Sequence, residues 1–105
     1  MTTKSQKSDA IQFLESLTHG PMTVGKLLYS LRKSEEISQV AFAKKLGISK
    51  QTLCDIEKER TAVSSARAAR FAKKLKFPPA FFIQLALQEE LKREGIRLLV
   101  KVEVA

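Results

Sequence analysis

The stretch AFAKKLGISKQTLCDIEKER, residues 41–60, decides the fold of this chain. It consists almost entirely of good helix-forming residues, yet Gly47 interrupts it near its start. Serines that can cap a helix stand before both halves, Ser38 before QVAFAKKL and Ser49 before KQTLCDIEK. A tight turn between two helices needs a residue at positive φ, which glycine adopts without steric cost. The interruption therefore predicts a helix-turn-helix with Gly47 in its turn.

The apolar residues around this turn have the spacing of a two-helix corner. Ala43 stands one helical turn before Gly47, where a small side chain lets the helices approach closely. An ordinary helical hairpin in a bundle is the alternative, but it requires only the glycine and not the full spacing. The residues that we expect to point inward are Phe42, Leu46, Ile48, Leu53 and Ile56.

The composition of the whole chain bounds its function. The 105 residues are enough for one small domain. The net charge of +8 favours a polyanionic partner, nucleic acid or an anionic membrane, although it could serve solubility alone. Cys54 is the only cysteine, and no catalytic set or phosphate-binding glycine loop is visible, so we expect no enzyme, no cofactor and no metal site. The polar start and the lack of a bilayer-spanning run predict a cytoplasmic protein without a membrane partner.

Helix signals recur along the chain until its last ten residues. Capping residues precede the apolar segments, and Gly20, Gly47 and Gly95 follow three of them. This pattern predicts an all-α fold of five to six short helices, to which one C-terminal strand is added. The expected helices occupy residues 8–20, 24–36, 39–46, 50–58, 66–75 and 80–94.

The segment IRLLVKVEV, residues 96–104, has the one strand pattern, because apolar side chains recur at every second residue. An isolated strand leaves its backbone donors and acceptors unpaired, and no second strand is visible in the chain. We therefore expect this strand to pair antiparallel across a dimer, with Leu98, Val100 and Val102 packed on the preceding helix. The alternatives are a disordered tail and a strand that pairs with a toxin partner instead.

The block from Leu27 to Leu75, about half of the chain, resembles the Cro/C1-type (Xre) helix-turn-helix family. The resemblance implies a lambda-repressor-like core that binds double-stranded DNA. It divides the chain into an N-terminal arm with a short helix (1–22), a DNA-binding domain (23–77), and a C-terminal helix with a dimerisation strand (78–105). Glu59 departs from the family, which usually has glycine after the second helix. The signature residues are Ser38-Gln39, Ala43, Gly47-Ile48-Ser49 and Ile56-Glu57.

The resemblance also implies that residues 50–58 form the recognition helix, which enters the major groove of DNA. On a helical wheel with Leu53 and Ile56 inward, the opposite side of this helix faces outward. Lys and Gln side chains pair with guanine and adenine edges in the major groove. A merely solvated helix face is the alternative. The outward residues are Lys50, Gln51, Cys54 and Asp55.

Three of these residues are the expected base contacts, namely Lys50, Gln51 and Asp55. Asp55 would bind a cytosine amino group or orient Lys50 or Gln51. Cys54 is expected to be a passive small side chain rather than a redox sensor.

Phosphate contacts are expected at helix starts, whose free N–H groups bind phosphates. The resemblance places Gln39 at such a contact, and it places Arg60 and Thr61 in a loop that also meets the DNA backbone. Thr52 is expected to contact phosphate as well. The expected DNA-binding set is Gln39, Ser49, Lys50, Gln51, Thr52, Asp55, Arg60 and Thr61.

One expected ion pair is structural. Glu57 lies at the edge of the inward face of the recognition helix, where an unpaired carboxylate would be costly. The resemblance implies that Arg32, in the helix before the motif, meets this carboxylate. Together with Ala43 and Gly47, the pair would hold the motif together.

These observations predict a sequence-specific transcriptional repressor that acts as a homodimer on a palindromic operator. Small members of the family are often HigA-like antitoxins, which repress their own operon and neutralise a toxin protein. The alternatives are a restriction-modification or phage regulator, and a toxin-neutralising interaction module with little DNA binding of its own. An RNA-binding role fits the charge but not the groove geometry, because the A-form major groove is too narrow for a helix.

Overall fold

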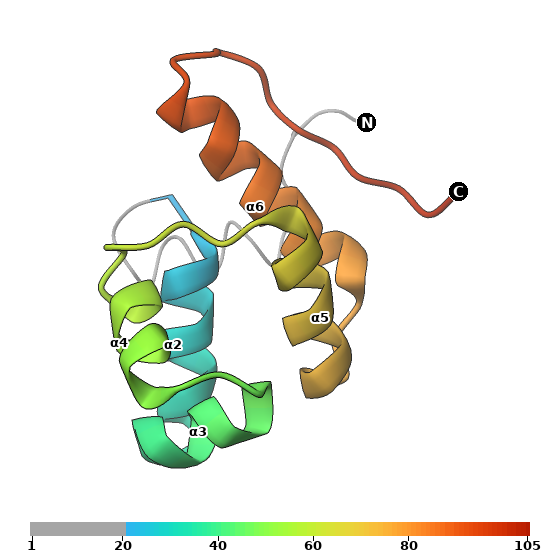
Figure 1. The fold of residues 1–105 in the computed structure, drawn as a ribbon. Helices are drawn as coiled ribbons and strands as arrows, with labels where there is room; N and C mark the ends of the chain where they lie inside the picture. Colours follow the sequence, from blue (N-terminus) through green and yellow to red (C-terminus); the bar gives the residue numbers. More distant parts are fainter. Residues whose placement is uncertain (1–20) are drawn as a thin grey trace.

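Five α-helices follow one another in the computed structural model, which describes residues 21–105 (Figure 1). The helix expected at residues 8–20 lies outside the described residues. None of the helices in residues 21–105 has the length and apolar character that a membrane-spanning helix needs. The helices are α2 (Val24–Glu35), α3 (Gln39–Leu46), α4 (Lys50–Glu57), α5 (Ser65–Leu75) and α6 (Pro79–Arg93).

Side-chain caps start four of the five helices. Thr23, Ser38, Ser49 and Ser64 each accept a hydrogen bond from the backbone N–H three residues later, in α2, α3, α4 and α5 respectively. Helix α6 has no such cap and begins with Pro79, whose fixed φ suits the first helical position. The helix starts therefore follow from local residue choice.

One hydrophobic core joins all five helices. Gly25 of α2 is buried, and a Cβ atom at this position would collide with the backbone carbonyl of Ile56 in α4. Figure 1 shows α2, α3 and α4 grouped together, with α5 and α6 packed beside each other. Of the residues expected to point inward around the turn, only Ile48 is half-buried rather than buried. The largest fully buried side chains are Phe42, Phe71, Phe82, Leu27, Leu28, Leu46, Leu53, Ile56 and Val24.

The strand expected at residues 96–104 does not form within the described chain. After Gly95, at φ 74°, the backbone turns and runs back along α6 without regular structure (Figure 1). A strand needs a second backbone beside it, and residues 21–105 offer none here. Leu98, one of the expected packing residues, is 64% exposed, whereas Val100 and Val102 are half-buried.

Glutamine side chains of α6 take the place of that second backbone. Gln88 donates to the Leu98 carbonyl oxygen (Nε2 to O, 2.9 Å) and accepts from the Val100 N–H (N to Oε1, 2.7 Å). Gln84, one turn earlier, accepts from the Val102 N–H at 3.1 Å. The two glutamines therefore satisfy one edge of the C-terminal segment.

Glu89 connects α6 to the start of α2. Its carboxylate accepts a hydrogen bond from the Val24 N–H (Oε2 to N, 2.7 Å), one of the free donors at that helix end. Burial raises the pKa of Glu89 above its ordinary value of 4.5, although the Val24 bond acts in the opposite direction. The raised pKa means that the Glu89 carboxyl group binds a proton more tightly in the folded chain than in the unfolded chain.

This raised pKa predicts a pH dependence of stability. The contribution of Glu89 is fully present below pH 4.5, and it is lost as the pH rises through the folded-state pKa. Glu89→Gln keeps an oxygen for the Val24 N–H but cannot ionise. We expect the stability of this variant, relative to the unmodified chain, to rise from acid to neutral pH in urea unfolding. A difference that stayed constant over this range would contradict the assignment.

Candidate nucleic-acid interface

Helix α4 turns one face into the core and the other to the surface. Leu53 is 0% exposed and Ile56 1% exposed, so both side chains lie inside. Lys50 and Gln51 are exposed on the opposite side, and Asp55 is half-buried beside them. The inward and outward faces that the helical wheel predicts for this helix are therefore confirmed.

A hydrogen-bonded cluster lies on the outer face of α4. Asp55 accepts from the amide of Gln51 (Nε2 to Oδ1, 3.1 Å) and from the guanidinium of Arg60 (Nη1 to Oδ1, 3.4 Å). One carboxylate thus ties a side chain of the helix to the loop that follows it. Lys50 makes no hydrogen bond or ion pair with any residue from 21 to 105, so its ammonium group is available.

The start of α4 has its own hydrogen bonds. Ser49 accepts from the Thr52 N–H at 3.0 Å, and its hydroxyl also contacts Thr52 Oγ1 at 2.8 Å. The two hydroxyl groups therefore satisfy each other at the helix end that carries Lys50 and Gln51. Gly47 precedes this end at φ 76°, as its place in the turn requires.

The ion pair expected between Arg32 and Glu57 is present, and it is largely shielded from solvent. Arg32 donates to both carboxylate oxygens, from Nε at 2.8 Å and from Nη2 at 3.0 Å. The two side chains are 12% and 3% exposed. Arg32 also donates to the Ile37 carbonyl at 3.2 Å, so it joins α2, the α2–α3 connection and α4. The hydrogen bond with Glu57 raises the pKa of Arg32 further above its ordinary value.

Gln39 has a partner that sequence reasoning missed. Its side-chain amide donates to Glu57 (Nε2 to Oε1, 2.9 Å), which gives this carboxylate a third donor. Gln39 is the first residue of α3, 18 positions before Glu57, and no local pattern relates the two. The position expected at a phosphate is therefore coupled to the Arg32–Glu57 pair.

The α4–α5 loop keeps a left-handed turn without glycine. Glu59 has φ 60°, a conformation that a glycine would adopt more easily. The Arg60 N–H donates to the Asp55 carbonyl at 2.8 Å and helps hold the turn. The departure from glycine at this position therefore leaves the turn in place. Arg60 and Thr61 are both exposed.

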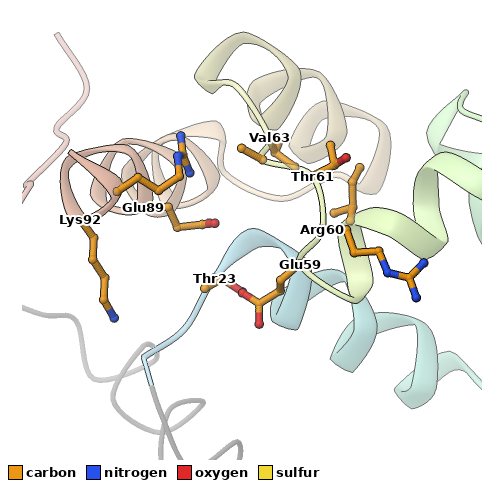
Figure 2. A pocket seen from close by; sticks show the side chains of 11 residues that line it. Thr23, Glu59, Arg60, Thr61, Val63, Glu89 and Lys92 are labelled. Atoms are coloured by element: carbon orange, nitrogen blue, oxygen red, sulfur yellow. The ribbon is translucent and has the colours of Figure 1, made fainter. Parts of the chain in front are cut away.

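This loop also borders a cavity of about 400 Å³, whose other walls come from the start of α2 and from α6 (Figure 2). Glu59 and Glu89 lie at its rim, whereas the guanidinium of Arg60 turns away from it towards α4. Arg60 therefore lines the cavity with part of its chain, while its guanidinium group lies on the outer face of α4. Within residues 21–105, no group of three or more His, Cys, Asp or Glu residues is placed to hold a metal ion.

Comparison with known proteins gives one match. A family model described as "Helix-turn-helix" matches residues 28–82, which run from α2 into α6. Searches of curated proteins and of solved structures returned no match.

Proposed function

The chain belongs to the Cro/C1-type helix-turn-helix family of DNA-binding transcription regulators, and we propose that it is a repressor that binds a palindromic operator as a homodimer. The observation that carries this proposal is the outer face of α4. There Lys50 is free, and Gln51 is held in place by Asp55.

Base recognition would come from two side chains of different mobility. Lys50 is a free cation that can reach guanine O6 and N7. Gln51 is bonded to Asp55 before any DNA arrives, so less conformational freedom is lost when its amide meets an adenine edge. Asp55 would therefore act by orienting Gln51.

The backbone contacts would fix the register of α4 on the duplex without reading sequence. Gln39 stands at the start of α3 and is tied to Glu57 at the end of α4. Arg60 is tied to the same helix through Asp55. A phosphate bound at either residue would therefore be positioned relative to α4 itself.

The base contacts can be tested on an operator selected from a random-sequence duplex library. Lys50→Ala and Gln51→Ala should lose about 1–3 kcal/mol of discrimination at particular base pairs. Gln39→Ala should instead weaken binding to all sequences alike. Lys92→Ala, which removes an exposed cation of α6, controls for net charge. If Lys50→Ala and Gln51→Ala kept full discrimination at every base pair, this orientation on DNA would be wrong.

A second proposed function is that of a HigA-like antitoxin, which would also neutralise a toxin protein. Its support is the C-terminal segment, where Leu98, Leu99 and Val104 are 64%, 52% and 92% exposed. Co-purification with the product of an adjacent reading frame tests this. A chain that binds its operator but no neighbouring gene product would be a repressor alone.

A further inference from the structure

The C-terminal segment has one satisfied edge and one open edge. Residues at even positions direct backbone groups towards α6, where Gln84 and Gln88 bind them. Neighbouring residues of an extended chain direct their N–H and C=O groups to opposite sides. The backbone groups of Leu99, Lys101 and Glu103 therefore point away from α6, and they make no hydrogen bond to any residue from 21 to 105.

The side chains confirm that this segment is extended. Lys101 and Glu103, two residues apart, form an ion pair of 3.1 Å, so they lie on the same face. Both are more than two-thirds exposed, at 78% and 71%. The opposite face carries Val100 and Val102, which are half-buried. The segment thus has the geometry of a strand whose second neighbour is missing.

We propose that the open edge pairs with the same edge of a second copy, antiparallel, around a two-fold axis at Val100. This proposal rests on the homodimer of the proposed function and names the surface that forms it. Leu99 and Lys101 of one copy would face Lys101 and Leu99 of the other, and each facing pair would exchange two hydrogen bonds. Gln84 and Gln88 would hold both outer edges, so a ribbon of only two strands would have a helix on either side.

When two copies of residues 96–104 run antiparallel about Val100, the residues that face each other are complementary. Pairing about this residue sets Arg97 opposite Glu103 of the second copy, which places opposite charges together on the exposed face. On the other face it sets Leu98 opposite Val102, and Ile96 opposite Val104. Every cross-strand pair on that face is then apolar.

The neighbouring registers are less favourable. An axis at Lys101 would set two lysines directly opposite each other, and like charges in that position are destabilising. An axis at Val102 would pair Lys101 with Glu103 of the second copy, but it would separate Glu103 from Arg97. Of these three registers, only the axis at Val100 pairs residues 96–104 with themselves throughout and sets Arg97 opposite Glu103.

A cysteine scan distinguishes these registers. In a Cys54→Ser background, Val100→Cys would place two Cα atoms about 4.5 Å apart across the axis, within the range of a disulfide. Val102→Cys would place them about 14 Å apart, four residues out of step, which is too far. Under mild oxidation we expect a cross-linked dimer from Val100→Cys and little from Val102→Cys. Cross-linking at 102 alone would overturn the register, and cross-linking at neither would overturn the ribbon.

A charge exchange tests the same register without oxidation. Glu103→Arg sets two arginines opposite each other in each pair and should raise the dimer dissociation constant measured by analytical ultracentrifugation. Adding Arg97→Glu restores the opposite charges and should restore the dimer. Adding Lys101→Glu instead should not, because this residue faces Leu99 in the proposed register. Rescue by Lys101→Glu alone would point to the axis at Val102 and contradict the proposal.

These outcomes are separable from failure of the repressor proposal. A chain that binds its operator as a dimer but neither cross-links at 100 nor responds to the charge exchange would use another dimer surface, and the ribbon would be rejected alone. A chain that cross-links at 100 but selects no sequence from the random duplex library would keep the ribbon and lose the operator. Gln51→Ala changes α4 and not the C-terminal segment, so it should leave cross-linking at residue 100 unchanged in either case.

Discussion

Arg32→Ala is expected to lower the free energy of unfolding by about 3 kcal/mol, far more than the loss of a surface charge. The reason is the carboxylate of Glu57, which is 3% exposed and has two of its three side-chain donors from Arg32. Without them, Gln39 alone would remain to compensate a buried charge. Urea unfolding at neutral pH measures the change.

Two variants separate this effect from charge and volume. Lys45→Ala removes the ion pair with Glu35, whose side chains are 44% and 43% exposed, and it should change stability by less than about 1 kcal/mol. Arg32→Met combined with Glu57→Leu removes both charges and should recover much of the loss, because no unpaired carboxylate is left. An Arg32→Ala chain as stable as the unmodified one would show that Glu57 does not need its partner.

The helices could be predicted because their signals are local. Ser38, Ser49 and Ser64 cap the helices that follow them, and Gly47 takes the positive φ that its position in the turn required. The outward face of α4 followed from two inward residues and the helical period. Each of these inferences depends on residues within a few positions of one another.

The contacts that escaped prediction join residues far apart in the chain. Glu89 binds the start of α2 from 65 positions away, and Gln39 reaches Glu57 from 18. The period-two pattern of residues 96–104 is real, but a strand also depends on what lies beside it. Within the described chain the neighbours are the side chains of Gln84 and Gln88, which no strand pattern could reveal.

Gly25 belongs with these long-range features and supports the second large prediction. Gly25→Ala should destabilise the chain by about 3 kcal/mol, although alanine is the better helix former by about 1 kcal/mol. A Cβ atom at this buried position of α2 would overlap the Ile56 carbonyl of α4, and both groups belong to backbones that cannot rotate aside. The helices α2 and α4 would have to separate. Thermal and urea unfolding should both show the loss.

The sign of the change is what tests the contact. Gly25 does not have a positive φ, so an alanine at this position would suffer no backbone strain. Without the collision, the alanine would therefore stabilise α2. Gly95→Ala provides the opposite case, since nothing lies within 4 Å of a Cβ there and only the φ of 74° opposes the substitution. We expect it to lose about 1–2 kcal/mol from conformation alone. Because α4 is the helix that Gly25→Ala displaces, that variant should also lose operator affinity, whereas Gly95→Ala should keep it. A Gly25→Ala chain more stable than the unmodified one would mean that α2 and α4 do not touch at this point.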